Sequence, residues 1–591
     1  MKFVFDIETN GLLDALNKIH CIVLKDIETE KVYSFTPDKV EEGLELLSNA
    51  NLIIGHNITT FDLPAIKKVY PNFHTKAHAF DTLVAARLIW ADIKSKDFQN
   101  HSQYGFNPKL IGSHSLKAWG VRLNLHKGKF GENTDWQEWS PQMQEYCEQD
   151  VEVNDLFYKI IEKKNYSQQA LELEHQFAVC ISLQERQGFC FDKEAAEKLL
   201  TTLVKRRIEL EEELQIAFPS WTKDLGEFIP ARDNKTKGYI KGVAINKYET
   251  VTFNPNSRYH IADRLKEKYK WKPKEFTPDG KPQVDEKILS KLEYPEAKLL
   301  SEYLLIQKRI SQLAEGNSAW LKLEKGNKIY GSVNTNGAVT GRCTHMRPNI
   351  AQVPAVGVPY GKECRSLFIA PPNFKLVGVD VSGLELRCLA HYMARYDSGL
   401  YAKQVTEGDV HTFNQEAMGL PSRNLAKRVI YALIYGCGDK KMGEIIKGTA
   451  AQGKALKEKL FKNLPALENL SSAVKDKVQR TNSLKGLDGR ILNVRSNHSA
   501  LNFLIQSCGS IIVKKATCLL HEKLFSKYKY GEDWSMVAHI HDELQLQVKE
   551  SLVDEIGKIA VQSVKDTQDV FNLRCPLDAE YKVGKNWAET H

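Results

Sequence analysis

The chain has 591 residues, of which 42% are apolar and 26% charged, and its net charge at neutral pH is +8. A chain of this length and composition can bury several hydrophobic cores, so we expect more than one domain. No apolar run approaches the roughly 20 residues that span a membrane, and the first residues form a strand-like pattern rather than a signal peptide, which argues against a membrane or secreted protein.

The small positive charge is compatible with a polyanionic partner but does not require one. The 11 cysteines show neither a CxxC pair nor a zinc-ligand spacing. Cys388, Cys508 and Cys518 lie in apolar segments, where small buried thiols are common. We therefore expect reduced, structural thiols in a cytoplasmic protein.

The first acidic pair lies in the strand-like segment 2–11. Asp6 and Glu8 are two positions apart. Because side chains of a β-strand alternate between its two faces, both carboxylates lie on one face at the end of the strand. Two like charges on one face repel unless a cation or solvent compensates them. A solvated turn therefore remains an alternative to a metal site.

Two further segments add carboxylates. Residues 53–66 form an apolar strand followed by polar residues, and Asp62 precedes an expected helix. Near residue 150 the helical pattern places Tyr146 and Asp150 four positions apart, hence on one helix face. The spacing allows both side chains to reach one site.

In this order the three segments resemble the motifs of the DEDD 3′-5′ exonucleases, in the variety that contains a tyrosine. The resemblance implies two divalent cations, one that activates the attacking water and one that stabilises the leaving oxygen. The implied metal ligands are Asp6, Glu8, Asp62 and Asp150. Tyr146 matches the tyrosine that orients the water. Four unrelated surface acids are the alternative, and they leave Tyr146 to chance.

Helical patterns follow at about 167–215 and 285–322. Between them, segment 264–276 interleaves lysines with aromatic residues, a composition suited to phosphate contacts. A solvated helix face followed by a loop explains this segment equally well.

Residues 376–395 form the pattern of a buried strand that ends at Asp380, a Ser-Gly turn, and an amphipathic helix that begins near Glu385. A carboxylate at a strand end can project into a cleft. The N-cap role falls more naturally to Ser382, which immediately precedes the helical run.

Residues 422–438 form a helical pattern with Arg423, Lys427 and Tyr431 at successive four-residue steps. One helix face thus carries two cations and an aromatic ring. Taken alone, this pattern is equally typical of a basic surface helix with a partly buried tyrosine.

Residues 538–548 alternate apolar and polar side chains, which is typical of half-buried strands. We expect an antiparallel hairpin anchored by Val537, Ile540, Leu544 and Leu546. Its tip would carry His541, Asp542 and Glu543. A polar turn is the alternative, because aspartate is common in turns.

The strand with Asp380, the helix with Tyr431 and the hairpin with Asp542 resemble motifs A, B and C of the family A DNA polymerases. Four segments resemble more narrowly the replicative polymerases of T-seven-type bacteriophages: "NTNGAVTGRCTHMRPNIAQVP", "SGLELRCLAH", "GDVHTFNQ" and "SNHSALNFLIQS". The similarity extends from Asp6 to the terminal "NWAETH". It implies a DNA-templated DNA polymerase that extends a primer with deoxynucleotides and proofreads its product.

The resemblance also implies the roles of individual residues. Two Mg²⁺ ions, with Mn²⁺ as a substitute, would bind Asp380, Asp542 and the backbone carbonyl of Val381. The triphosphate would contact His411, Arg423 and Lys427, with Lys427 a candidate general acid. Tyr431 would pack beneath the incoming nucleotide, and a tyrosine here goes with acceptance of dideoxynucleotides. Glu385 would block a 2′-hydroxyl, and Glu543 is not expected to be an essential ligand.

Other matched positions imply contacts with primer-template DNA. Arg342, His498 and Gln506 resemble side chains that read minor-groove acceptors, which are similar in all correct base pairs. Tyr435 would stack on the template. For the first three, a structural hydrogen bond is a competing explanation.

We therefore expect a mixed α/β protein. An RNase H-like exonuclease domain would span residues 1–165 and a right-hand polymerase domain residues 166–591. Within the latter, the thumb would span about 190–322 with a short loop insertion at 222–251, the palm about 323–395 and 486–591, and the fingers about 396–485.

The short insertion at 222–251 departs from the T-seven-type pattern, in which a longer insertion binds host thioredoxin. This argues against thioredoxin as a partner, and the basic "DNKTKGYIKG" suggests DNA or a different clamp instead. A helicase-primase partner in a replisome stays open. A nuclease-dominated repair enzyme and a non-catalytic nucleic-acid-binding protein are the rival functions, and the intact polymerase motifs argue against both. The family match implies action in the cytoplasm of a phage-infected host.

Overall fold

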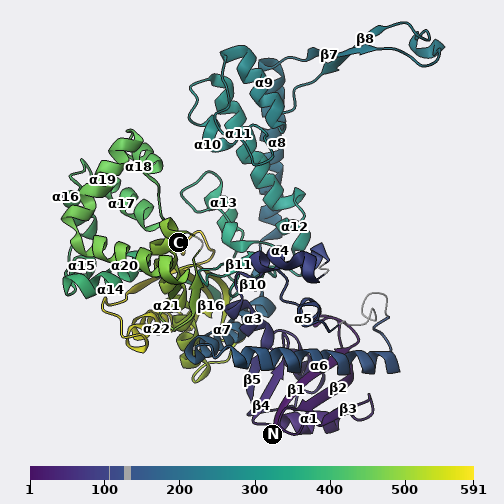
Figure 1. Cartoon of the computed structure of the whole chain (residues 1–591), viewed down its shortest axis with the longest axis vertical. Coiled ribbons are helices and arrows are strands. Elements are labelled where there is room, and N and C mark those ends of the chain that lie inside the picture. Colours follow the sequence, from purple (N-terminus) through teal and green to yellow (C-terminus); the bar gives the residue numbers. More distant parts are fainter. Residues whose placement is uncertain (105–106, 126–134, 495) are drawn as a thin grey trace. The chain divides into compact units, whose positions relative to one another are not determined.

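The computed structural model describes residues 1–104, 107–125, 135–494 and 496–591 (Figure 1). The chain forms two units. Unit 1 comprises Met1–Phe189, Tyr330–Gln352 and Ile369–His591, and unit 2 comprises Cys190–Ile329 and Val353–Phe368. Unit 1 includes the residues on both sides of the domain boundary expected near residue 165, and helix α7 (Gln168–Gln187) packs against both α3 and α21 of this unit.

Unit 1 begins with a five-stranded sheet in the order β3-β2-β1-β4-β5. The strands are β1 (Lys2–Thr9), β2 (Ile19–Asp26), β3 (Val32–Phe35), β4 (Leu52–Gly55) and β5 (His78–Asp81). Strand β1 runs antiparallel to β2 and parallel to β4, so the expected mixed sheet is confirmed. This order and these directions are consistent with the RNase H-like fold.

The helices in this part of the chain are α1 (Val40–Ser48), α2 (Asp62–Val69), α3 (Thr82–Ile89), α4 (Ile93–Tyr104), α5 (Leu116–Arg122) and α6 (Pro141–Lys163). The long α6 packs against β1 and β2 (Figure 1). It begins at the N-cap Ser140, whose hydroxyl accepts from the Met143 amide, and Pro141 occupies the first turn.

The helical pattern at 167–215 is two helices rather than one. Helix α7 ends at Gly188, which adopts a φ of 67°, and α8 (Lys193–Ala217) begins after the N-cap Asp192. The short strand β6 (Phe189–Cys190) lies between them. Helix α7 belongs to unit 1 and α8 to unit 2.

The second helical stretch, 285–322, is also divided. It forms α10 (Glu286–Leu289), α11 (Pro295–Ile310), a π-helical turn (Ser311–Glu315) and α12 (Trp320–Leu323). Pro295 is the first residue of α11. Proline has no backbone N–H, but at this position an N–H would have no partner within the helix, so nothing is lost. Unit 2 also contains α9 (Arg258–Tyr269), β9 (Lys328–Ile329) and α13 (Gly361–Ser366).

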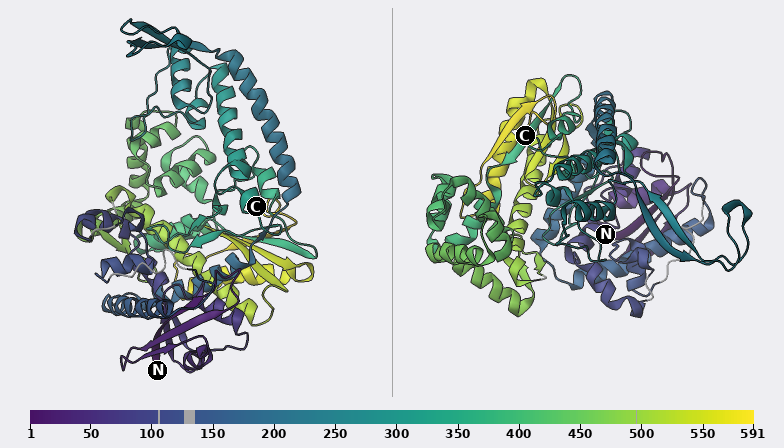
Figure 2. Two further views of the ribbon diagram at one scale, coloured as in Figure 1. Left: turned by 90° about the vertical axis from the view of Figure 1, so that its right-hand side faces the viewer. Right: turned by 90° about the horizontal axis from the view of Figure 1, so that it is seen from above.

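The insertion expected as a loop at 222–251 is a β-hairpin. Strands β7 (Trp221–Phe228) and β8 (Ile245–Val251) are antiparallel, and the hairpin projects beyond the helices of its unit (Figures 1 and 2). Trp221 pairs with Val251 and Thr222 with Thr250. Such aromatic and β-branched pairs stabilise a ladder, which the basic composition of the insertion had hidden.

A second difference concerns the segment expected as palm at 323–395. Residues 353–368 belong to unit 2, whereas 330–352 and 369–395 belong to unit 1. The Asp192 amide donates to the Leu367 carbonyl at 2.8 Å, and Phe191 forms a β-bridge with Phe368. These contacts join the segment to the start of α8.

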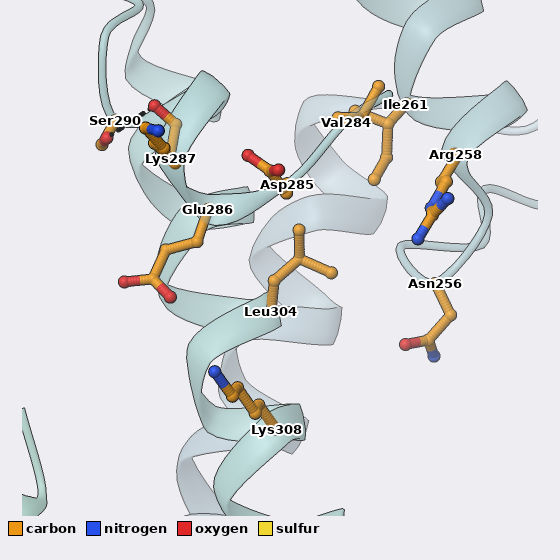
Figure 3. A pocket seen from close by; sticks show the side chains of 10 residues that line it. All are labelled: Asn256, Arg258, Ile261, Val284, Asp285, Glu286, Lys287, Ser290, Leu304 and Lys308. Carbon is orange, nitrogen blue, oxygen red and sulfur yellow. Dashed lines mark hydrogen bonds between the residues drawn. The ribbon is translucent and has the colours of Figure 1, made fainter. Parts of the chain in front are cut away.

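A cavity of about 570 Å³ lies within unit 2 between the start of α9, α10 and α11 (Figure 3). Arg258, Lys287 and Lys308 line it together with Asp285 and Glu286. The residues predicted to form the two carboxylate sites all belong to unit 1, and none of them lines this cavity.

The second sheet of unit 1 is antiparallel, with the order β15-β16-β12-β17. Its strands are β12 (Phe374–Val381), β15 (Trp534–Ile540), β16 (Glu543–Lys549) and β17 (Ala579–Gly584). The expected hairpin at 538–548 is confirmed, and its four apolar anchors are buried. The two short strands β10 (Ser332–Asn334) and β11 (Thr344–Met346) form a separate ladder.

The hairpin strands are not half-buried, however. Every residue of β15 and all but the last residue of β16 are buried. The polar face is covered by the end of the chain, where Trp587 Nε1 donates to Glu543 Oε1 at 2.5 Å and Thr590 Oγ1 donates to Gln545 Oε1 at 2.9 Å. The alternating pattern therefore reflects two chemically different buried faces.

The remaining helices of unit 1 are α14 (Leu384–Asp397), α15 (Leu400–Thr406), α16 (Val410–Met418), α17 (Arg423–Ile434), α18 (Asp439–Ile445), α19 (Ala450–Asn463), α20 (Pro465–Thr481), α21 (Ala500–Phe525) and α22 (Val553–Val570). Strands β13 (Ser483–Lys485) and β14 (Ile491–Asn493) connect α20 to α21. The segment Asn497–Phe525 is long and apolar enough to cross a membrane, contrary to our expectation, but 78% of its apolar window is buried within the protein. This is the burial of a core helix.

The 11 cysteines are free thiols, and Cys388, Cys508 and Cys518 are buried as expected.

Candidate functional site

The first candidate site lies where β1 meets α2. Asp6 and Glu8 are on β1, and Asp62 is the first residue of α2. Burial, and secondarily the nearby Asp81 carboxylate, raise the pKa of Asp62 to about 7, whereas the backbone of Ile7, the residue between the β1 acids, favours the ionised form.

Helix α6 contributes the second half of this site. Tyr146 has a raised pKa, first because of burial and then because Asp150, Glu8 and Asp6 are close to it. All four predicted carboxylates and Tyr146 are thus brought together from three elements.

Cys147, which the sequence did not single out, belongs to the same cluster. Its sulfur lies 3.8 Å from Asp6 Oδ2, and one ligand atom each of Asp6, Glu8 and Cys147 lie within 4.8 Å of one another. Cys147 follows Tyr146 in the sequence, but no spacing distinguishes it from the other buried thiols.

The donor set of this site suits a hard divalent cation. Glu8, Asp62 and Asp150 are at most 9% exposed, and carboxylate oxygens are the ligands that Mg²⁺ and Mn²⁺ prefer. Burial of several like charges is costly unless a cation balances them. These residues therefore fit two-metal chemistry.

The second candidate site lies at the end of β12. Asp380 pairs with Glu543 on one side and with Glu580 on the other. The Val381 amide donates to the Asp542 carbonyl at 3.1 Å, so the hairpin tip lies directly beside the end of β12. Asp380 and Asp542, 162 positions apart in the chain, are neighbours because the sheet order places β16 next to β12.

The electrostatics of this pair resemble those of the first site. Burial, followed by the Asp542 and Glu543 carboxylates, raises the pKa of Asp380 to about 6. Burial and then Glu385 raise the pKa of Asp542. Two close carboxylates that resist ionisation together are a suitable donor set for a divalent cation.

Glu385, on the first turn of α14, contacts two other predicted residues. Its Oε1 accepts from Tyr435 Oη at 2.9 Å and lies 3.4 Å from Arg342 Nη2. Gly383, with a φ of 59°, precedes this helix as its N-cap, and no side chain caps it. The expectation that Ser382 caps the helix is therefore wrong, because the left-handed turn at Gly383 moves the helix start by one residue.

Helices α16 and α17 present the predicted cations. Arg423 Nε donates to Asp409 Oδ2 at 2.7 Å, and Asp409 also caps α16. The pKa of His411 is lowered by burial and then by the neighbouring Arg423 and Lys427. The three predicted triphosphate contacts thus lie together.

Tyr431 connects these helices to the carboxylates. Its ring centroid lies 6.3 Å from that of His411. Burial, followed by Glu385, Tyr435, Asp542 and Asp380, raises the pKa of Tyr431 to about 12. The phenol therefore lies between the cationic helices and the acidic pair.

His498 and Gln506 are less closely integrated. His498 is exposed, and its carbonyl lies 3.3 Å from the position of a Cβ at Gly436, just after α17. Gln506 is half-buried on α21. Within the described part of the chain neither side chain has a hydrogen-bond partner, so a structural hydrogen bond does not explain them.

A cavity of about 240 Å³ beside Asp380 contains residues that the sequence did not reveal. Glu580, Lys582 and the terminal His591 line it together with Asp380 and Glu543. His591 Nδ1 lies 3.0 Å from Glu543 Oε2. Glu580 could have been found if the pairing of β17 with β12 had been predicted. No local sequence pattern indicates His591.

Comparisons with known proteins show the family of the chain. Residues 231–589 match DNA polymerase family A. The chain is 35% identical to the DNA-directed DNA polymerases of Escherichia phage T7 and Enterobacteria phage T3, over 706 and 703 aligned positions that cover 100% of each chain. It is 26% identical to DNA polymerase I of Aquifex aeolicus, over 99% of this chain and 95% of that one.

A solved structure, the POL domain of Pol1 from M. smegmatis in complex with DNA primer-template and dNTP, has the same fold. Its TM-score is 0.74 at 17% identity, and the match covers 99% of this chain and 96% of that chain. The chain belongs to DNA polymerase family A. Its function class is DNA-directed DNA polymerase, and it resembles the phage T7 and T3 enzymes over its whole length.

Proposed function

We propose that the chain extends a DNA primer with deoxynucleotides at the Asp380 site by two-metal phosphoryl transfer. The observation that supports this most directly is the adjacency of Asp380 and Asp542 at the ends of two neighbouring strands. Asp380, Asp542 and the Val381 carbonyl would hold Mg²⁺ or Mn²⁺. When bound, such cations activate the primer 3′-hydroxyl and neutralise the charge of the triphosphate.

The other residues of this site orient the nucleotide. His411, Arg423 and Lys427 bind the triphosphate, and Lys427 donates a proton to the leaving pyrophosphate. When the nucleotide enters, the Arg423 guanidinium releases the Asp409 carboxylate and donates to phosphate oxygens instead, since both are anionic acceptors. Tyr431 packs beneath the base and sugar.

Glu385 excludes ribonucleotides. Its carboxylate is held by Tyr435, so a 2′-hydroxyl would meet an oriented side chain rather than a mobile one. Arg342, His498 and Gln506 contact the minor groove of the bound duplex, and Tyr435 stacks on the template. The absence of hydrogen-bond partners for His498 and Gln506 among the described residues supports a role toward DNA.

We also propose a 3′-5′ proofreading activity at the first site. Asp6, Glu8, Asp62 and Asp150 would hold two divalent cations there, and the protonated Tyr146 hydroxyl, close to Asp150, Glu8 and Asp6, would orient the attacking water. The clustering of these residues from β1, α2 and α6 supports this activity.

A primer-extension assay with Mg²⁺ tests both activities. Asp380→Asn should lose lengthening by about 100-fold or more, the scale of lost electrostatic stabilisation, while it still shortens the primer when dNTPs are omitted. Asp6→Asn should show the opposite pattern. If Asp380→Asn lengthened primers at the wild-type rate, the polymerase site would be assigned to the wrong residues.

The β7–β8 hairpin is a further candidate for DNA binding. Its tip, residues 229–244, contains four cations and one acid, and the side chains of Ile229 and Ile240 are exposed. The alignment with the phage T7 enzyme has 706 positions, whereas this chain has 591 residues, so this chain has gaps where the relative has residues. This supports the absence of a long insertion. We propose that the tip contacts the duplex directly, without thioredoxin, and that the enzyme acts in the host cytoplasm with or without a helicase-primase.

A further inference from the structure

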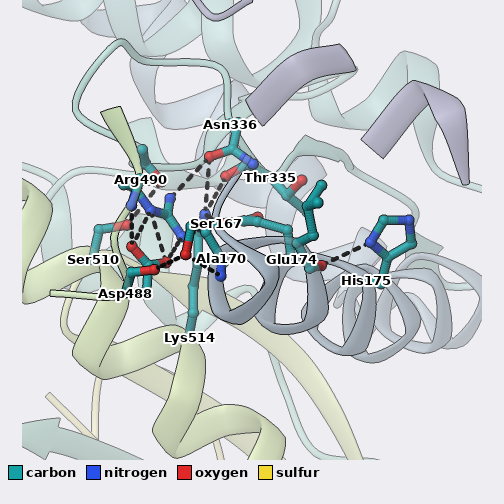
Figure 4. Close-up of polar contacts among 12 residues, drawn as sticks. Ser167, Ala170, Glu174, His175, Thr335, Asn336, Asp488, Arg490, Ser510 and Lys514 are labelled. Atoms are coloured by element: carbon teal, nitrogen blue, oxygen red, sulfur yellow. Dashed lines mark hydrogen bonds and ion pairs between the residues drawn. The ribbon is translucent and has the colours of Figure 1, made fainter. Parts of the chain in front are cut away.

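Four charged side chains of unit 1 are fully buried where three elements meet (Figure 4). They are Glu174 of α7, Asp488 and Arg490 of the β13–β14 turn, and Lys514 of α21, each at most 1% exposed. We call them the buried charge cluster. Two cations and two carboxylates leave it neutral.

The members of the cluster are in direct contact. Lys514 Nζ donates to Glu174 Oε1 at 2.6 Å, and Arg490 Nη2 lies 2.7 Å from the same oxygen. Arg490 Nη2 also donates to Asp488 Oδ2 at 2.6 Å. Burial of charges is costly, and apolar packing of the same volume often gives equal or greater stability. Stability alone therefore does not explain the cluster.

The remaining contacts of the cluster reach the loop 335–342. Lys514 Nζ donates to the Thr335 carbonyl at 2.8 Å, and Arg490 Nη1 donates to Asn336 Oδ1 at 3.3 Å. These bonds fix the beginning of the loop.

The end of the loop is fixed as well. Ser510 Oγ donates to the Gly341 carbonyl at 2.8 Å. Gly341 adopts a φ of 80°, and a Cβ there would lie 2.7 Å from Arg490 Nη1, so the backbone passes directly against the guanidinium. The Ala338 amide donates to the Arg342 carbonyl at 3.1 Å and closes the loop.

The loop carries Arg342, whose guanidinium lies against Glu385. We infer that the buried charge cluster and Ser510 are positioning residues that hold the backbone of 335–342, so that Arg342 meets the minor groove at the primer terminus in one fixed register. This inference rests on the proposed DNA contact of Arg342. It assigns to Glu174, Asp488, Arg490, Ser510 and Lys514 a part in discrimination between matched and mismatched primer ends.

Ser510→Ala is the decisive variant, because it removes one hydrogen bond to the loop and leaves the charges intact. Ser563→Ala is the matched control, since Ser563 is also buried but donates to Ile559 of its own helix α22 at 2.8 Å. Extension of matched and mismatched primers, protected from exonuclease by a terminal phosphorothioate, gives the rate and the KM for the next dNTP.

For Ser510→Ala we expect a threefold to tenfold slower extension of matched ends, the scale of one hydrogen bond, with the KM for dNTP and the mismatched rate unchanged. Lys514→Met should give the same pattern with a larger loss. In an Arg342→Ala background, Ser510→Ala should have no additional effect, because both changes act through one contact.

Each of three results for Ser510→Ala would show that the cluster does not act through Arg342. They are an equal loss on matched and mismatched ends, an undiminished effect in the Arg342→Ala background, and rates equal to those of Ser563→Ala. If Arg342→Ala itself leaves discrimination unchanged, the proposed DNA contact fails and the inference fails with it. If Arg342→Ala reduces discrimination and Ser510→Ala does not, only the inference fails.

Discussion

At the scale of single residues, Tyr431 places a phenol hydroxyl near the acidic pair, and burial raises its pKa to about 12. Like other tyrosines it is protonated at neutral pH. We therefore expect this hydroxyl to be able to donate a hydrogen bond near the incoming nucleotide. A dideoxynucleotide lacks the 3′-hydroxyl, and the phenol can replace the missing polar group.

Tyr431→Phe should therefore reduce the ratio of dideoxynucleotide to deoxynucleotide incorporation by about tenfold or more, equivalent to one good hydrogen bond. Competition assays that measure chain termination would give this ratio. Tyr401→Phe, which removes a buried hydroxyl that bonds Asn414, serves as the control. Equal ratios for the wild type and Tyr431→Phe would contradict the assigned role.

A second residue-scale prediction concerns His521 of the core helix α21. The side chain is 3% exposed, and burial lowers its pKa to about 4, whereas a histidine in the unfolded chain has a pKa of about 6.5. The unfolded chain therefore binds more protons between these values. His521 thus contributes stability above about pH 6.5 that is lost as the pH falls toward 4.

His521→Phe should remove this dependence. Between pH 7.5 and pH 5 the free energy of unfolding should fall by about 1–2 kcal/mol less in the variant than in the wild type. Urea unfolding at both pH values measures the difference. Comparison of the two pH values within each protein cancels any change in packing against Trp534, and parallel curves would refute the prediction.

At the scale of elements, the β7–β8 hairpin allows a direct test of DNA binding. Reversal of Lys235, Lys237 and Lys241 to glutamate should weaken primer-template binding and shorten the products of a single binding event. The dependence of log K on log salt should become shallower by about 0.9 for each lost phosphate contact.

Salt titrations of DNA binding would measure this slope. Thr236→Ala, in the same tip but without a change of charge, is the control. A slope identical to that of the wild type would exclude contact between the tip and phosphates.

Elements also decide what the sequence could and could not predict. The strand with Asp380 was predictable from its apolar run and the Ser-Gly turn that follows it, and the hairpin with Asp542 from its alternation of apolar and polar residues. The burial of both hairpin faces was not, because the covering residues Trp587 and Thr590 lie more than 40 positions away.

The same reasoning explains other differences. The break between α7 and α8 depends on the left-handed Gly188, which a continuous helical pattern conceals. Glu174 and Lys514 are 340 positions apart, and each resembles an ordinary charged residue of an amphipathic helix until both are found buried. Local patterns thus predict elements and motif residues, whereas partnerships between distant polar groups require the fold.

At the scale of the whole molecule, α7 joins the N-terminal sheet to the C-terminal core of unit 1. On one side, Ala170 and Leu171 pack in a buried cluster with Trp119 and Phe157, and the Asp81 amide donates to His175 Nε2 at 2.8 Å. On the other side, Glu174 belongs to the buried charge cluster. The N-terminal residues 1–165 therefore support the helix that holds this cluster.

We predict that a chain reduced to residues 166–591 loses stability in addition to the proposed proofreading. Removal of residues 1–165 exposes the apolar face of α7, so the unfolding midpoint of the shortened chain should fall by several degrees. Asp6→Asn in the full chain, which abolishes only the proposed nuclease chemistry, should unfold at the wild-type temperature.

Calorimetry of both proteins, together with Leu171→Ala in the full chain, would test this. Leu171→Ala should lower the midpoint in the same direction, because truncation of a buried leucine typically costs about 2–5 kcal/mol. Polymerisation by the shortened chain should decline on warming before that of Asp6→Asn does. Equal midpoints for the shortened and full-length chains would mean that residues 1–165 give the rest of the chain no structural support.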